Sequence, residues 1–190
     1  MCWYTKKNRI RKVNIAAVGL LSLTAATILS CQTSSSESKN QTVREFDLPS
    51  FFQQEVKYLN SSKPKITKTV LKDSVSETKE VIIADWNKEL SSFLSVDLNK
   101  PAYRGTYIKD SVNNTVTYTF KDSTIDLSLV TIVYNDQIPT ILTIKKSTKN
   151  LLYNTEENLK YIRRKSYNVI KDQSVRILGN QHYNIEGVIE

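Results

Sequence analysis

The chain has 190 residues and a formal net charge of +8, with four Gly, four Pro, two Cys and a single His. So few His and Cys residues argue against zinc, copper and haem sites, and we expect no metal and no cofactor. The basic balance would suit nucleic-acid binding, but much of the surplus comes from the first twelve residues.

Residues 1–30 have the composition of a bacterial export signal. Five basic residues lie before residue 13, and the run 15–29 contains no charged side chain. A basic start followed by a short apolar run is typical of secretory signal peptides. The residues Ile28-Leu29-Ser30-Cys31 then match a lipobox, with Ile where Leu is more usual. We therefore expect residues 1–30 to be a lipoprotein signal peptide.

Cys31 is the predicted lipidation site. In a lipobox the Cys sulfur receives diacylglycerol through a thioether, the small residue before it permits cleavage, and the new amine is acylated with a palmitate-type chain. The alternatives are an uncleaved membrane anchor or an ordinary cleaved signal. The apolar run is shorter than the about 20 residues that span a bilayer, which disfavours the anchor. The expected location is the cell envelope, with the exported chain held on the outer membrane by lipid on Cys31.

Cleavage before Cys31 changes both the charge and the thiol count. It removes five of the 27 basic residues and none of the 19 acidic ones, so 22 basic residues remain and the net charge is +3. Together with export, this argues against a nucleic-acid partner. Cys2 leaves with the signal, so the mature domain is expected to fold without a disulfide.

The predicted elements follow in chain order. Residues 31–43 are polar and are expected to form a lipidated flexible tether. A helix is predicted over 47–60, with Asp47 as cap and Pro49 in its first turn. A hairpin is predicted from Lys65–Lys72 and Thr78–Ile83. A second helix is predicted over 86–97, with Trp86 buried on the sheet and its N–H reaching a carbonyl or water.

From Tyr103 onward the apolar pattern has a period of two, which predicts strands. Turns are expected at Asn113-Asn114 and Asn135-Asp136. Within the strand 125–134, one face is expected to carry Ile125, Leu127, Leu129, Thr131 and Val133. Residues 156–161 could form a helical turn instead of a strand. The predicted strands are 103–109, 115–121, 125–134, 138–146, 151–153, 161–171, 175–178 and 183–189.

Short connections between these strands indicate an antiparallel meander. The predicted fold class is α+β, with two N-terminal helices packed on a twisted antiparallel β-meander sheet. We expect residues 44–190 to form a single α+β domain.

No catalytic motif is present, so we do not expect an enzyme. The lone His182 is predicted to lie in a polar turn facing solvent. The acidic pairs Glu156-Glu157, Asp122 with Asp126, and Glu77 with Glu80 are expected to be solvated. Residues 110–114 resemble the start of a calcium loop only faintly, because the turn Gly and the final Glu are missing.

Two groups of side chains are each open to two interpretations. The basic clusters Arg163-Arg164-Lys165 and Lys145-Lys146 are either solvated strand ends or contacts for anionic headgroups or acidic polysaccharide. The nine Tyr residues after the signal either form cross-strand pairs, which we favour, or bind sugars or peptides.

Four segments of the sequence carry a resemblance to a known family: Asp85-Trp86-Asn87-Lys88-Glu89-Leu90, Asp97-Leu98-Asn99-Lys100-Pro101-Ala102-Tyr103, Asn150-Leu151-Leu152-Tyr153 with Glu156-Glu157, and Val175-Arg176-Ile177-Leu178-Gly179. In these segments the sequence resembles a family of uncharacterised membrane-anchored lipoproteins from Bacteroidota. The resemblance covers residues 45–188 and implies an envelope lipoprotein without an assigned activity, so no catalytic residue is carried over.

Two functions are therefore compared. The leading hypothesis is a non-catalytic, membrane-anchored envelope lipoprotein that binds or scaffolds an envelope protein or a cell-wall component. The alternative is a periplasmic carrier or chaperone that holds an apolar ligand or lipid between the helices and a curved sheet. The run 125–134 motivates the alternative, since it is apolar on both faces near its end.

Overall fold

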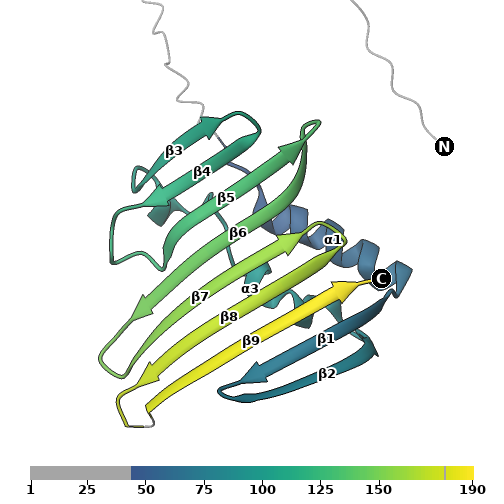
Figure 1. Ribbon diagram of the computed structural model, residues 1–190. Helices are drawn as coiled ribbons and strands as arrows, with labels where there is room; N and C mark the ends of the chain where they lie inside the picture. Colours follow the sequence, from purple (N-terminus) through teal and green to yellow (C-terminus); the bar gives the residue numbers. More distant parts are fainter. Residues whose placement is uncertain (1–43, 178) are drawn as a thin grey trace, which may run out of the picture. The chain divides into compact units, whose positions relative to one another are not determined.

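One antiparallel sheet of nine strands makes up most of the structure, and helices are few (Figure 1). The computed structural model describes residues 44–177 and 179–190, which lie in one compact unit. The strand order is β2-β1-β9-β8-β7-β6-β5-β4-β3, so β3 to β9 form a meander and β1 pairs with β9. The predicted antiparallel meander is confirmed. The strands are β1 (Lys65–Lys72), β2 (Val75–Ile82), β3 (Tyr107–Val112), β4 (Thr115–Phe120), β5 (Leu127–Asn135), β6 (Ile138–Lys149), β7 (Tyr153–Ile162), β8 (Ser166–Val175) and β9 (Gly179–Ile189).

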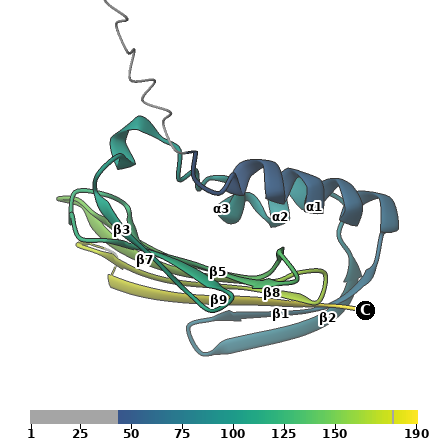
Figure 2. The same cartoon turned by 90° about the horizontal axis from the view of Figure 1, so that it is seen from above.

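The helices all lie on one face of the sheet (Figure 2). Helix α1 (Leu48–Ser62) begins where the Asp47 side chain accepts a hydrogen bond from the Ser50 amide at 3.0 Å. It ends at Lys63, whose φ of 45° is left-handed. The first predicted helix is therefore confirmed, because its capping signals are local.

The second predicted helix, 86–97, is wrong in its length. It consists of two single turns, α2 (Trp86–Glu89) and α3 (Ser91–Leu94), followed by the 3-10 turn η1 (Pro101–Tyr103). Leu90 interrupts the helix with φ −98° and ψ 17°. Leu90 is nevertheless fully buried, so packing against the core outweighs helical continuity here.

The core fills the space between the helices and the sheet. Leu48, Phe52 and Leu59 of α1 are fully buried, and the Phe52 ring lies 5.3 Å from that of Tyr161 on β7. Trp86 is also fully buried, edge-on to Tyr167 on β8. Its predicted burial is confirmed, but its expected hydrogen bond is not: among the described residues the indole N–H has no partner.

Strands β7 and β8 differ from their predicted bounds. Residues 156–161 lie within β7 and not in a helical turn, and a turn at 163–165 interrupts the predicted strand 161–171. Arg164 takes the left-handed conformation in that turn, with φ 54°. No Gly or Asn stands there, so the usual sequence signal for such a turn is missing. Similarly, residues 176–177 form a turn where a strand was predicted.

The prediction that one face of β5 carries Ile125, Leu127, Leu129, Thr131 and Val133 is wrong beyond Leu127. The register of β5 against β6 shifts between Leu127 and Leu129, which is the mark of a β-bulge. After the bulge, Val130 and Ile132 are buried, while Thr131 is only half-buried. One extra residue exchanges the two faces of a strand, so the remainder of the predicted face points away from the core.

Carboxylates from the helical layer are bound by Tyr residues of the sheet. Glu55 of α1 accepts a hydrogen bond from Tyr161 at 3.0 Å and pairs with Arg163 and Arg164 at 3.0 and 3.3 Å. Glu89 of α2 accepts from Tyr167 and pairs with Lys68 at 2.7 Å. These contacts hold α1 and α2 at fixed places on the sheet, because charge-assisted hydrogen bonds are directional and strong.

Glu45 makes a similar contact at the β3 edge of the sheet. It accepts hydrogen bonds from Tyr107 at 2.9 Å and Tyr118 at 3.0 Å, and it pairs with Lys109 at 2.7 Å. Burial and the bond to Glu45 raise the pKa of Tyr107 to about 12, so its hydroxyl remains a donor at neutral pH. The segment that enters the domain is thus fixed to β3 and β4.

We expect Glu45 to contribute to acid unfolding. Burial raises the pKa of its carboxyl, but hydrogen bonds from Lys109, Tyr107 and Tyr118 outweigh burial, so the pKa is lowered overall. A lowered pKa in the folded state stabilises the protein above the pKa of the unfolded chain, and this stabilisation is lost as pH falls through the folded-state pKa. Glu45→Gln should cost about 1–2 kcal/mol at neutral pH and reduce the loss of stability in acid.

The measurement is the free energy of unfolding by denaturant between pH 7 and pH 3. Glu186→Gln is the matched control, because Glu186 is exposed on the sheet. If Glu45→Gln and wild type lose stability in parallel as pH falls, Glu45 does not contribute in this way.

Candidate binding surface

A polar hollow of about 450 Å³ opens near one end of β7, β8 and β9. Glu156, Asp172 and His182 occupy strand positions that alternate with core-facing residues, so these three side chains lie on the outer face, away from the helices. The lining combines carboxylates, amides, one hydroxyl and one imidazole: Asp73, Asn154, Glu156, Asp172, Gln173, Ser174, Asn180, Gln181 and His182.

Strand register explains how the charged side chains meet. Asp172 on β8 stands directly opposite Glu156 on β7 and directly opposite His182 on β9. The His182 Nδ1 atom lies 2.6 Å from an Asp172 carboxylate oxygen, and the His182 amide donates to Asp73 at 2.9 Å. Two carboxylates facing each other across strands repel, so an additional hydrogen-bond donor or cation in the hollow would relieve them.

The predicted position of His182 is wrong in part. It lies within β9 and not in a turn, and its side chain is half-exposed and bonded to Asp172. The pairing of Asp172 with His182 can be predicted from sequence only if the register of β8 against β9 is known. The strand wrongly predicted at 175–178 gives the wrong ends for these strands and so hides that register. Among the described residues, no Ser forms a hydrogen bond with the imidazole.

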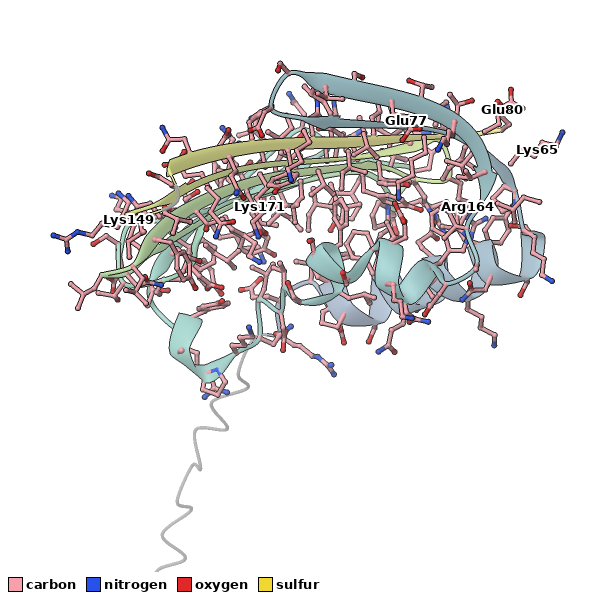
Figure 3. All side chains as sticks on the ribbon, turned by 90° about the horizontal axis from the view of Figure 1, so that it is seen from below. Lys65, Glu77, Glu80, Lys149, Arg164 and Lys171 are labelled. Atoms are coloured by element: carbon pink, nitrogen blue, oxygen red, sulfur yellow. The ribbon has the colours of Figure 1, made fainter. Side chains whose placement is uncertain are left out.

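The expectation that the acidic pairs are solvated is wrong for Glu157 and Asp126. Glu156 lies on the outer face, whereas Glu157 lies on the helix face and pairs with Lys146 and Lys171, each at 3.3 Å. Figure 3 shows Lys171 on the helix side of the sheet. Asp122 binds Thr124, and Asp126 accepts from Tyr103.

Glu77 and Glu80 stand three residues apart on β2 and therefore on opposite faces of that strand. Residues 110–114 form the end of β3 and a hairpin turn in which Asn113 has φ 52°. In residues 44–177 and 179–190, no three His, Cys, Asp or Glu side chains are grouped so that they could hold a metal ion.

The basic cluster at 163–165 has an internal role that neither earlier alternative describes. Arg163 and Arg164 bind the buried Glu55, and the Arg164 guanidinium stacks 3.6 Å from the centre of the Tyr58 ring. For the Tyr residues, the alternatives were cross-strand pairs or the binding of sugars or peptides, and neither is complete. Tyr107 and Tyr118 do pack together, but their hydroxyls bind Glu45. These Tyr and Arg side chains are occupied within the domain.

The remaining predicted site, Cys31, lies outside the described residues. No helix in the described part of the chain has the length and apolarity needed to span a bilayer. No family model, curated protein or solved structure matches the chain.

Proposed function

We propose that the chain is a lipoprotein of the bacterial cell envelope, anchored to the outer membrane by lipid on Cys31, without catalytic activity. In this proposal the tether 31–43 presents residues 44–190 as a rigid binding module of the α+β class. The partner is an envelope protein or a cell-wall component.

The filled interface between helices and sheet is the observation that supports a module over a carrier. A carrier for an apolar ligand needs an apolar cavity, usually of about 300 Å³ or more. Here Phe52, Trp86 and Phe93 are fully buried between the layers. Hydrogen bonds to Glu55 and Glu89 hold the helices against the sheet. The larger hollows described, of about 450, 460 and 540 Å³, lie at strand ends and include many polar residues.

The chemistry of the hollow supports a particular class of partner. Asp73, Glu156 and Asp172 bring negative charge, and the amides around them donate and accept hydrogen bonds. Such a lining suits a group rich in hydroxyls or bearing an amine, and it disfavours an anionic polymer.

The test is to purify tagged full-length protein from membranes and identify the bound proteins, glycans and lipids by mass spectrometry. We compare wild type with Asp172→Asn and with Lys160→Gln, an exposed residue elsewhere on β7. We expect Asp172→Asn to recover at least about fivefold less of the partner than wild type, because one hydrogen bond to a charged group is lost. Lys160→Gln should recover as much of the partner as wild type. A free lipid bound one-to-one would favour the carrier, and a partner retained by Asp172→Asn would exclude the hollow as its site.

A further inference from the structure

Two neighbouring hairpin turns carry exposed apolar side chains at one end of the sheet. Leu151 and Leu152 lie in the turn between β6 and β7, and Ile177 lies in the turn between β8 and β9. Their exposed fractions are 89%, 68% and 90%. Figure 1 shows both turns at the same end of the sheet. Exposed apolar residues that gather in one place mark an interaction site more often than scattered ones do.

Hydrogen bonds close the first turn and join the second turn to it. The Asn150 side chain accepts from the amides of Leu152 and Tyr153, each at 2.9 Å, which closes the first turn. The Arg176 amide donates to the Leu152 carbonyl at 3.1 Å and so joins the two turns. Leu151 and Leu152 are therefore held on a closed turn, and Arg176 lies beside them.

Basic residues flank the two turns. Lys149 and Arg176 are both exposed, and neither forms an ion pair within the described part of the chain. Figure 3 shows Lys149 projecting from the end of the sheet. Lys149 stands opposite Asn154, so Glu156 is its diagonal neighbour at about 7–8 Å and offsets part of its charge. Arg176 follows Asp172 by four residues, or about 13 Å of strand, which exceeds the screening length of about 8 Å at physiological salt, so Arg176 presents positive charge beside the apolar side chains.

We propose that this tip, Leu151, Leu152 and Ile177 with Lys149 and Arg176, inserts into the interface of an anionic lipid bilayer. Apolar side chains that enter the acyl boundary beside basic residues that contact phosphates are the arrangement of interfacial membrane anchors. The inference rests on the proposed lipid anchor, which would keep the tip near a bilayer. The twelve residues 32–43 span at most about 43 Å when extended. Glu45 binds Tyr118 on β4, whose cross-strand row leads to Leu159 on β7, so the tip lies about 23 Å along β7 and about 14 Å across three strands from the start of the domain. The tether is therefore long enough for the tip to face the surface that holds the lipid.

The experiment places an environment-sensitive fluorophore on Ile177→Cys in the purified full-length protein, bound to vesicles of phosphatidylethanolamine with or without phosphatidylglycerol. The matched control carries the fluorophore on Glu80→Cys, at the opposite end of the sheet (Figure 3). With phosphatidylglycerol, we expect the emission of the Ile177→Cys label to shift to shorter wavelength and to be quenched by nitroxide lipids, and the Glu80→Cys label to do neither. Leu151→Ser with Leu152→Ser should reduce the inserted fraction about tenfold or more.

The outcomes separate the tip from the anchor. Vesicle flotation reports the anchor, and labelling of protein without an introduced Cys reports whether Cys31 is free. Protein that floats while the Ile177→Cys label stays in water retains the anchor and overturns the tip proposal. If Cys31 is free, the protein carries no lipid anchor, and the tip proposal then requires that Leu151→Ser with Leu152→Ser abolishes flotation. If Cys31 is free and the wild-type protein does not float, both proposals are overturned. A shift to shorter wavelength without nitroxide quenching indicates burial against protein and also overturns lipid insertion.

Discussion

Trp86→Ala should destabilise the protein by about 3–5 kcal/mol, a large part of the 5–15 kcal/mol typical of a domain. The Trp86 ring is fully buried and lies edge-on to Tyr167, with ring centres 6.0 Å apart. Truncation would leave a cavity beneath α2, because close-packed neighbours collapse only in part. The measurement is a denaturant melt followed by far-UV circular dichroism.

Trp86→Phe is the informative companion. In the described part of the chain the buried indole N–H has no hydrogen-bond partner, and leaving such a donor unsatisfied costs about 1–3 kcal/mol. Phe removes that donor while keeping a ring, so we expect it to cost less than half as much as Ala. If Trp86→Ala unfolds within about 1 kcal/mol of wild type, the ring is not a core anchor and a binding role becomes the better hypothesis.

Glu55→Ala should cost about 3 kcal/mol. Glu55 is 1% exposed and is the shared acceptor for Tyr161, Arg163 and Arg164. Removing one member of a buried ion pair costs about 3–5 kcal/mol, and the lower end applies here because both guanidinium groups reach solvent. Glu55→Gln keeps an acceptor for Tyr161 and should cost about 1–2 kcal/mol.

Glu77→Ala is the matched control for Glu55→Ala. Glu77 also pairs with a basic residue, Lys79, but both side chains are about two-thirds exposed. Exposed pairs of this kind contribute about 0–1 kcal/mol. The free energies of unfolding of the two variants should therefore differ by at least about 2 kcal/mol. Equal values would mean that the Glu55 contacts do not hold α1 on the sheet.

The parts of the fold that sequence predicts well depend on local signals. Asp47 and Pro49 identify the start of α1, and the turns at Asn113 and Asp136 are predicted because these residues tolerate the positive φ values of 52° and 49° that they adopt. The antiparallel meander follows from short connections, which parallel strands cannot use.

The errors arise where distant contacts decide local structure. Arg164 adopts a left-handed turn without Gly or Asn, and its side chain is held by Glu55, 109 residues earlier. The bulge near Ser128 exchanges the faces of β5 without altering its apolar content. The pairing of Asp172 with His182 depends on register, so an error of strand bounds conceals the hollow.

The most direct test of the central claim is metabolic labelling with a palmitate analogue, combined with the intact mass of the mature protein. For wild type, we predict a labelled chain that begins at Cys31 and carries no free thiol. For Cys31→Ser, we predict no label and an uncleaved or soluble precursor, with the folded domain unchanged. Label on the Cys31→Ser protein, or a wild-type chain that begins elsewhere without label, would contradict the account of a lipid-anchored envelope protein.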